Sequence, residues 1–279
     1  MRSIVVCGAG TMGSGIAETA ARSGFDSLLF DPSQEALDKA RARIGKNLDL
    51  LLVRQKITAI ELEDILGRIR FTAEPEKCIG DIVIEAIIEE IGAKRKLFAE
   101  LASINPSKTI LASNTSSLSL GEISKNIDDP SRFCGLHFFN PAPLMKLVEI
   151  VQTDETSMQV VRQVMDFTRA MGKTPVLCKD SPGFIVNRVA RHYYLEALQL
   201  VEESISDFAQ VDRLLENAGF RMGPFKLMDL IGNDINFTVT SSLYEAFGKA
   251  ARFKPSAIQE EKIRNGEFGR KSGKGYFTY

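Results

Sequence analysis

Histidine, cysteine and tryptophan are scarce in this chain of 279 residues, which contains two, four and none of them, respectively. A catalytic zinc usually takes about three His, Cys or carboxylate ligands, so two isolated histidines argue against a metal centre. The cysteines, Cys7, Cys78, Cys134 and Cys178, form no Cys-x-x-Cys pair and stand in apolar or strand-like segments. We therefore expect reduced, buried thiols and no bound metal.

Net charge and long apolar runs are lacking as well. The 35 Lys and Arg residues nearly cancel the 36 Asp and Glu residues, so no overall field attracts a nucleic acid or an anionic membrane. No apolar run approaches the ~18 residues of a membrane helix. A strand pattern opens directly after the first two residues and leaves no room for a signal or transit peptide. We expect a cytoplasmic protein without nucleic-acid or membrane partners.

The N-terminal segment carries the most informative local pattern. A buried-strand run, Ser3–Cys7, meets the glycine loop GAGTMG, and a helix rich in small residues follows to about Arg22. A second strand over residues 27–30 ends at Asp31. Strand, glycine loop, helix, strand and acid in this order are typical of a dinucleotide-binding unit, so the pattern predicts a nicotinamide cofactor.

Each member of this pattern has a physical reason. Gly8 lets the chain turn tightly, Gly10 lets the backbone approach a pyrophosphate, and Gly13 lets the helix and strand pack closely. The N-terminus of the helix then faces the phosphates. Asp31 can accept hydrogen bonds from a ribose hydroxyl and would repel a 2′-phosphate, so the pattern favours NAD over NADP.

The next segments alternate between helix and strand. A long helical excursion near 33–66 comes first, and strand patterns follow near 69–72, 82–86, 109–113, 133–136 and 175–178, with a helix over about 92–102. This rhythm predicts an α/β fold whose first domain, residues 1–180, contains a doubly wound, mainly parallel sheet. Ligands of such sheets bind beyond the carboxyl ends of the strands, where the polar segment 114–117 and His137 stand.

The pattern changes at the sequence KDSPG, residues 179–183. Beyond it the periodicity is helical over 184–203, 208–218, 227–247 and 255–264, which predicts an all-helical second domain over 181–279. The tail RKSGKGYFTY is glycine-rich and basic. It either forms a simple loop or folds back over the cofactor.

A catalytic base is expected, because hydride transfer to a nicotinamide needs an acceptor for the hydroxyl proton. A Tyr-x-x-x-Lys base is absent, since none of the five tyrosines has Lys four residues later. His192 lies within a helical pattern, which favours a packing or surface role. His137 ends an apolar strand run on the binding side of the sheet and is the better candidate.

Glu149 is flanked by apolar residues on both sides in the run LVEIV. An unpaired buried carboxylate costs several kcal/mol, so Glu149 either faces water from an edge strand or pairs with another group. An imidazole that becomes charged in catalysis is such a partner, because a carboxylate orients the ring and raises its basicity. These residues alone leave both alternatives open.

Six motifs resemble those of the L-3-hydroxyacyl-CoA dehydrogenase family, which includes the bacterial 3-hydroxybutyryl-CoA enzymes. In chain order they are GAGTMG, SNTSSL, GLHFFNPAPLMKLVEIV, KDSPGFIVNR, MGPFKLMDLIG and GRKSGKGYF, and they span essentially the whole chain. The resemblance implies a Rossmann-type domain, an interdomain cleft and a helical C-terminal domain that forms a homodimer. It also implies NAD-dependent oxidation of an (S)-3-hydroxyacyl-CoA to the 3-ketoacyl-CoA, or the reverse.

The resemblance also implies roles for single residues. The family's catalytic histidine falls on His137 and its partner on Glu149, and we expect their side chains to lie within hydrogen-bond reach. Ser116 and Asn187 would hold the substrate oxygen and the thioester region. The implied cofactor contacts are Gly8, Gly10, Met12, Gly13, Asp31, Glu89, Lys94, Ser116, Asn140 and Lys271. Without the family, Glu89, Lys94 and Lys271 would each be interpreted as plain surface charges.

The basic side chains of the helical excursion leave a further alternative open. They either meet phosphates of coenzyme A or form a solvated face balanced by acidic neighbours, and they are Lys39, Arg41, Arg43, Lys46, Arg54 and Lys56. Where relatives have a serine and a lysine, this chain has Asn47 and Arg54, so the coenzyme A contacts stay unassigned.

Two rival functions remain. One is an NAD enzyme that acts on 3-hydroxyadipyl-CoA or on a free hydroxyacid. The other is a non-enzymatic protein of the crystallin type that keeps the fold without the activity. The joint presence of Ser116, His137, Glu149 and Asn187 argues against the second.

Overall fold

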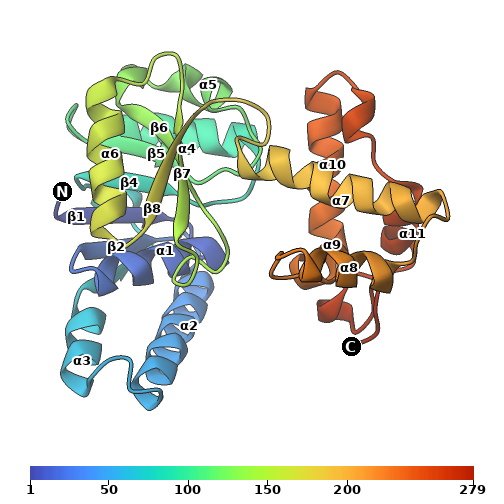
Figure 1. Ribbon diagram of the computed structural model, residues 1–279. Coiled ribbons are helices and arrows are strands. Elements are labelled where there is room, and N and C mark those ends of the chain that lie inside the picture. The colour runs from blue at the N-terminus through green and yellow to red at the C-terminus, as the bar shows by residue number, and fades with distance from the viewer. The chain divides into compact units, whose positions relative to one another are not determined.

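A computed structural model describes all residues 1–279, which divide into two compact units, Met1–Ser181 and Pro182–Tyr279 (Figure 1). The first unit contains one eight-stranded sheet with the order β3-β2-β1-β4-β5-β6-β7-β8. Its strands are β1 (Ser3–Cys7), β2 (Asp26–Phe30), β3 (Ile69–Thr72), β4 (Ile82–Glu85), β5 (Ile110–Ser113), β6 (Phe133–Phe138), β7 (Leu147–Gln152) and β8 (Thr174–Lys179).

Strand direction reverses once in this sheet. The six strands from β3 to β6 in sheet order run parallel to one another, whereas β7 pairs antiparallel with β6 and parallel with β8. The expected doubly wound, mainly parallel sheet is therefore confirmed. The reversal follows from the short connection between β6 and β7, because a parallel neighbour needs a crossover of a dozen or more residues.

Helices cover both faces of the sheet, which explains why its inner strands are apolar at nearly every position. On one face, α1 (Thr11–Arg22), α2 (Gln34–Val53) and α6 (Met158–Ala170) contribute apolar side chains to the largest hydrophobic core. On the other face, Phe98 of α4 (Ile91–Ile104) packs edge-on against Phe133, with ring centroids 4.9 Å apart, and the short helix α5 (Leu120–Ile123) lies beside α4.

Helix α6 was not predicted, although its sequence contains a helix signal. Ser157 caps the helix by accepting a hydrogen bond from the Val160 N–H. Val160, Val164 and Phe167 then recur at helical spacing and are buried.

The helical excursion consists of α2 and α3 (Ala59–Gly67). Ile44 and Leu48 of α2 form a small separate core with Ile65 and Ile69. Thr58 and Glu61 form a capping box at the start of α3. The excursion thus has its own apolar contacts, which fix α2 and α3 against each other.

The second unit is helical, as expected, with α7 (Val186–Glu202), α8 (Phe208–Asn217), α9 (Pro224–Ile231), α10 (Asn233–Ala246) and α11 (Ala257–Arg264). The predicted single helix over 227–247 is wrong, because the chain breaks into α9 and α10 at Gly232. Its φ of 107° lies in a region that a helix does not use. After the break, the Asn233 side chain donates a hydrogen bond to the Asp229 carboxylate at 3.0 Å.

The C-terminal tail is anchored within the second unit by one buried carboxylate. Asp229 accepts hydrogen bonds from the N–H groups of Tyr276 and Phe277 at 2.9 and 3.0 Å. A Cβ added to Gly275 would lie 1.9 Å from an Asp229 oxygen. The tail is therefore a packed segment and not a free loop.

Three of the four cysteines, Cys7, Cys78 and Cys134, are fully buried free thiols, and burial raises the pKa of Cys134 to about 12. Cys178 is only partly buried, so the expectation of burial is wrong for it. None of the helices combines the length and the apolar composition needed to cross a bilayer.

Replacement of Gly13 by alanine tests the close packing of α1. The added Cβ would lie 1.7 Å from the Gly8 carbonyl oxygen, so backbone must move. We expect Gly13→Ala to lower the free energy of unfolding by about 1–3 kcal/mol or more, measured by urea denaturation. Gly45→Ala is the matched control, because a Cβ on Gly45, inside α2, meets nothing within 4 Å. It should raise stability by about 0.5–1 kcal/mol, and equal effects of the two substitutions would contradict this account.

Candidate functional site

The glycine loop follows β1 and provides a cradle of bare backbone. A Cβ on Gly8 would lie 2.5 Å from the Ala86 carbonyl oxygen, whereas a Cβ on Gly10 would meet nothing within 4 Å. The neighbouring backbone at Ala86 therefore excludes any side chain at position 8, whereas the space beside Gly10 is open to a ligand. Helix α1 begins directly afterwards with no side-chain cap and no acidic residue in its first turn. Its free N–H groups therefore suit a pyrophosphate, and the loop fits the phosphates of a dinucleotide.

Asp31 stands at the end of β2, beside this loop. One carboxylate oxygen accepts a hydrogen bond from the Ala9 N–H at 2.8 Å, and the other accepts from the Ser33 N–H at 2.9 Å. These bonds fix the orientation of the carboxylate and leave further lone pairs as acceptors. An acceptor held next to the phosphate cradle is what the adenosine ribose of NAD requires.

His137 and Glu149 face each other across the antiparallel pair of β6 and β7. The His137 Nδ1 lies 2.7 Å from the Glu149 Oε2, and the two side chains are 7% and 1% exposed. The prediction that they lie within hydrogen-bond reach is confirmed. The alternative of an edge strand with Glu149 in water is wrong, because β8 pairs with β7 on its other side.

The contact between these side chains bears on which nitrogen of His137 carries the proton. An ionised carboxylate only accepts hydrogen bonds, so when Glu149 is ionised Nδ1 carries a proton and donates it to Glu149. In the neutral ring Nε2 is then the unprotonated nitrogen, and it can accept a proton. The Phe139 ring lies 4.5 Å from the imidazole, centroid to centroid, and the Asn114 side-chain oxygen accepts a hydrogen bond from the Phe138 N–H at 2.8 Å. These contacts restrain the end of β6 next to the histidine.

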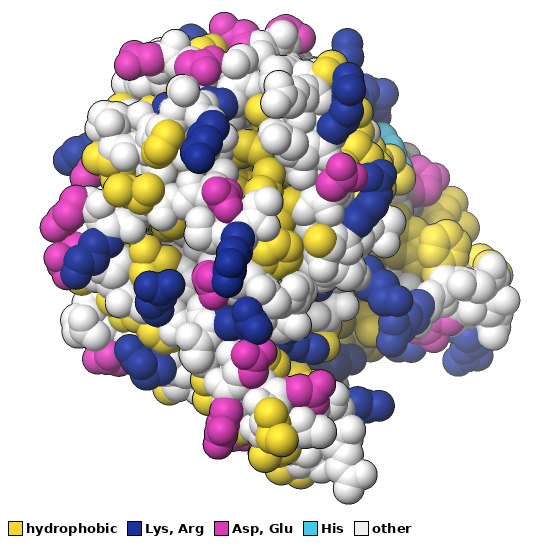
Figure 2. All heavy atoms as spheres, turned by 90° about the vertical axis from the view of Figure 1, so that its left-hand side faces the viewer, with side chains coloured by type: hydrophobic (Ala, Val, Ile, Leu, Met, Phe, Trp, Pro, Cys, Tyr) yellow, Lys and Arg dark blue, Asp and Glu magenta, His cyan; other side chains and the backbone are white.

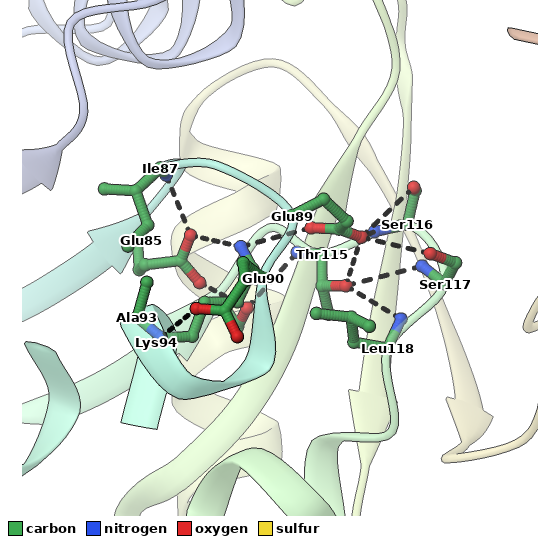
Figure 3. A network of polar contacts seen from close by, with 11 residues as sticks. Glu85, Ile87, Glu89, Glu90, Ala93, Lys94, Thr115, Ser116, Ser117 and Leu118 are labelled. Carbon is green, nitrogen blue, oxygen red and sulfur yellow. Dashed lines mark hydrogen bonds and ion pairs between the residues drawn. The ribbon is translucent and has the colours of Figure 1, made fainter. Parts of the chain in front are cut away.

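A second polar network lies at the carboxyl ends of β4 and β5 (Figure 3). Its centre is Lys94 in α4, whose Nζ lies 2.5 Å from a Glu85 oxygen and 3.2 Å from a Glu89 oxygen. Only 1% of the Lys94 side chain is exposed. Lys94 is therefore not the plain surface charge that its sequence context would suggest without the family, because the side chain points inward toward the end of β4.

Glu89 connects this network to the segment that contains Ser116. One Glu89 oxygen accepts hydrogen bonds from the Thr115 hydroxyl, the Ser116 N–H and the Ser117 hydroxyl, at 2.5, 2.9 and 3.2 Å. Burial alone would raise the pKa of Glu89, but the charge of Lys94 and the donated hydrogen bonds outweigh it and lower the pKa. Glu89 therefore stays ionised at neutral pH and holds the segment 115–117.

The remaining predicted residues lie in two groups. Met12 is half-buried in the first turn of α1, and Asn140 is exposed just beyond β6. Asn187 and Lys271 belong to the second unit, where Asn187 lies in the first turn of α7 and Lys271 pairs with Asp234 at 2.6 Å. Their contacts with substrate and cofactor stay predictions.

Three basic residues of α2 already have partners within the protein. Lys39 pairs with Glu35, Arg41 lies over the Phe71 ring, and Arg43 donates a hydrogen bond to the Ser14 hydroxyl; the distances are 2.6, 4.2 and 2.7 Å. For these three residues the structure favours the alternative of a structural or solvated role over contact with coenzyme A.

Charges of both signs are mixed on the face of the molecule drawn in Figure 2, with hydrophobic side chains between them. This distribution agrees with the net charge of −1. It provides no extended basic surface for a polyanion on that face.

Glu85 and Ser113 are the network residues that the sequence interpretation missed. Glu85 ends the apolar strand run IVIE and is 0% exposed. The signal at Glu149 was an acidic residue within an apolar strand run, and applied to IVIE a similar criterion would have found Glu85. Ser113 carries no comparable signal, since a serine at a strand end is common.

Two family models match nearly the whole chain. The model described as "3-hydroxyacyl-CoA dehydrogenase, NAD binding domain" matches residues 3–181, and the model described as "3-hydroxyacyl-CoA dehydrogenase, C-terminal domain" matches residues 183–279. The expected fold class, a Rossmann-type α/β domain followed by a helical domain, and the expected cofactor NAD are confirmed by these matches.

Individual relatives agree with the family models. The 3-hydroxyadipyl-CoA dehydrogenase of Escherichia coli is 46% identical over 100% of this chain, and the chain spans 59% of the length of that protein. A probable 3-hydroxybutyryl-CoA dehydrogenase of Deinococcus radiodurans is 38% identical, over 98% of this chain and 99% of its own. The crystal structure of (S)-3-hydroxybutyryl-CoA dehydrogenase PaaH1 from Ralstonia eutropha superposes with a TM-score of 0.96 at 33% identity, covering 100% and 99% of the two chains.

The protonation of His137 can be observed directly, because the chain contains only two histidines. With ¹⁵N-labelled histidine, the NMR spectrum near pH 8 should show His137 with its proton on Nδ1, the nitrogen that faces Glu149. His192→Gln identifies the remaining signal as that of His137. Glu149→Leu removes the acceptor and should move the proton population toward Nε2. A wild-type spectrum with His137 protonated only on Nε2 would rule out the proposed hydrogen bond.

Proposed function

This chain belongs to the 3-hydroxyacyl-CoA dehydrogenase family of NAD-dependent oxidoreductases, and we propose that it oxidises the 3-hydroxyl of an (S)-3-hydroxyacyl-CoA or reduces the corresponding ketone. The observation that carries this proposal is the buried pair of His137 and Glu149. Besides a dinucleotide-binding fold, hydride transfer from a hydroxyl needs a base that accepts the hydroxyl proton. A histidine at the end of a strand, held by a carboxylate, can serve as this base.

In the direction of oxidation, Nε2 of His137 accepts the proton of the 3-hydroxyl while the hydride leaves C3. NAD, which the glycine loop and Asp31 would hold, would supply the hydride acceptor. Glu149 holds the ring through Nδ1 and stabilises the imidazolium that forms. In the reverse direction the imidazolium returns the proton to the ketone oxygen. A general base of this kind contributes about 10²–10⁴-fold to the rate.

Other residues of the proposed site position the reactants. Ser116 and Asn187 hydrogen-bond the substrate near its reacting oxygen and its thioester. The glycine loop, with Met12, and Asp31 bind the adenosine and pyrophosphate part of the cofactor, supported by the open space at Gly10 and the free first turn of α1. The further cofactor contacts proposed are Glu89, Lys94, Ser116, Asn140 and Lys271. Positioning of this kind supplies several kcal/mol of the reduction in barrier.

The substrate proposed is a short acyl-CoA such as 3-hydroxybutyryl-CoA, which the R. eutropha and D. radiodurans relatives are named for. The alternative is 3-hydroxyadipyl-CoA, for which the E. coli relative is named. The 3-hydroxyadipyl group is two carbons longer and ends in a carboxylate, so the two substrates demand different chemistry at the far end of the acyl chain. The assembly proposed is a homodimer formed through the second unit.

The activity test uses acetoacetyl-CoA and follows NADH absorbance. We expect turnover with NADH, and at least ~10-fold lower kcat/KM with NADPH, because Asp31 opposes a 2′-phosphate.

Glu149→Gln should lower kcat by about 10–100-fold with little change in the KM for acetoacetyl-CoA, since it weakens the base without touching substrate. Absence of turnover by the wild type at any pH would overturn the proposal.

The same assay separates the rival functions. A higher kcat/KM on 3-oxoadipyl-CoA than on acetoacetyl-CoA would identify the dicarboxylic substrate. Activity on free acetoacetate would identify a hydroxyacid dehydrogenase. NADH binding without turnover of any of these would identify a non-enzymatic family member.

A further inference from the structure

Glu85 is a fully buried carboxylate to which the proposed mechanism gives no role. It ends β4 and is 0% exposed. One of its oxygens accepts hydrogen bonds from Lys94 Nζ at 2.5 Å and the Ile87 N–H at 2.8 Å, and the other accepts from the Ser113 hydroxyl at 2.7 Å (Figure 3). A buried charge is tolerated when it is paired and its remaining lone pairs are satisfied, and Glu85 meets both conditions.

These contacts form one continuous series from the sheet to the segment that contains Ser116. Glu85 on β4 holds Lys94, Lys94 lies between Glu85 and Glu89, and Glu89 accepts hydrogen bonds from Thr115, Ser116 and Ser117. Ser113, which donates to Glu85, ends β5 directly before that segment. Both ends of the series are therefore attached to the carboxyl ends of neighbouring strands.

The charges in this series are unevenly shared. Two carboxylates and one ammonium carry a net charge of −1, and the buried Glu85 and Lys94 form the closer pair. Glu89 is 38% exposed, so the surplus negative charge lies at the accessible end of the network. A carboxylate placed there can accept hydrogen bonds from ribose hydroxyls, provided that Lys94 keeps it in position.

We infer that Glu85 is a positioning residue for the nicotinamide cofactor: it fixes Lys94, and through Lys94 it sets the position of Glu89 and the segment 115–117. The inference rests on the proposed function for the identity of the cofactor. It assigns Glu85 no contact with cofactor or substrate. The competing explanation is that Glu85 only neutralises a buried lysine and contributes to stability alone.

The test measures NADH binding by fluorescence titration, without substrate, on three variants. Glu85→Gln keeps the shape of the side chain and removes its charge. We expect it to raise the dissociation constant for NADH about 10-fold, because residues of one hydrogen-bond network are energetically coupled. Glu85→Asp keeps the charge but shortens the side chain, and it should raise the constant by a smaller factor. If Glu85→Gln does not fold, Glu85→Asp carries the test.

Glu18→Gln is the matched control. Glu18 is also a buried glutamate of the first unit, 1% exposed, and it pairs with Arg22 and Asn47 outside the network. It should leave the dissociation constant within twofold of the wild type even if its melting temperature falls as far as that of Glu85→Gln. In turnover, Glu85→Gln should raise the KM for NAD about 10-fold, whereas Glu18→Gln should leave it within twofold of the wild type.

Several outcomes overturn the inference. NADH affinity of Glu85→Gln within twofold of the wild type overturns it, as does an equal loss in Glu18→Gln or full affinity in Glu85→Asp. A wild type that binds NADH but turns over no acyl-CoA contradicts the proposed function and leaves this inference standing. A wild type that does not bind NADH contradicts both.

Discussion

The antiparallel pairing of β6 with β7 is the constraint on which the candidate site depends. It places His137 directly opposite Glu149, and the parallel pairing of β8 with β7 removes Glu149 from the edge of the sheet. A carboxylate buried in this way requires a partner, and the imidazole supplies it at 2.7 Å. With Glu149 ionised, this hydrogen bond places the ring proton on Nδ1 and leaves Nε2 able to accept a proton. A parallel sheet of this kind would otherwise provide only a binding site for a dinucleotide. The one reversal of strand direction adds a residue that is able to exchange a proton.

The same physical rule operates at Glu85. Both glutamates stand in apolar strand runs, both are buried, and both are satisfied by a group that a neighbouring element presents. The partner of Glu149 is an imidazole from the neighbouring strand, a group that can both accept and donate a proton. The partner of Glu85 is the Lys94 amino group from a helix, which donates a hydrogen bond to it and suits fixed positioning. The chemistry of a buried carboxylate in this fold therefore depends on the partner that the topology supplies.

Much of this arrangement could be predicted from the sequence because it depends on local patterns. The glycine loop, the apolar strand runs and the acid after β2 are short-range signals, and the structure places Gly8, Gly10, Gly13 and Asp31 as those signals indicated. The apolar neighbours of Glu149 indicate that burying its carboxylate without a partner would be costly. Two alternatives followed, exposure to water at an edge strand or pairing with His137. The family resemblance favoured the pairing.

The rest depends on tertiary contacts that local patterns do not encode. The burial of Lys94 follows from the position of Glu85, nine residues earlier on another element. The break between α9 and α10 follows from Gly232 and from the Asp229 carboxylate, which also binds the tail more than forty residues later. Apolar periodicity continues across that break, so periodicity alone predicted one helix. Helix α6 is the exception, because its cap and its periodic apolar face are local signals that predict it.

The most direct test of the central claim is single-turnover reduction of acetoacetyl-CoA by His137→Ala loaded with NADH. If His137 is the proton donor and acceptor, the rate should fall about 10²–10⁴-fold while NADH affinity stays within about twofold, and added imidazole should restore part of the rate by occupying the vacated space beside Glu149. His192→Ala should react at the wild-type rate. A His137→Ala enzyme that reduces acetoacetyl-CoA as fast as the wild type would contradict the assignment of His137 as the catalytic base.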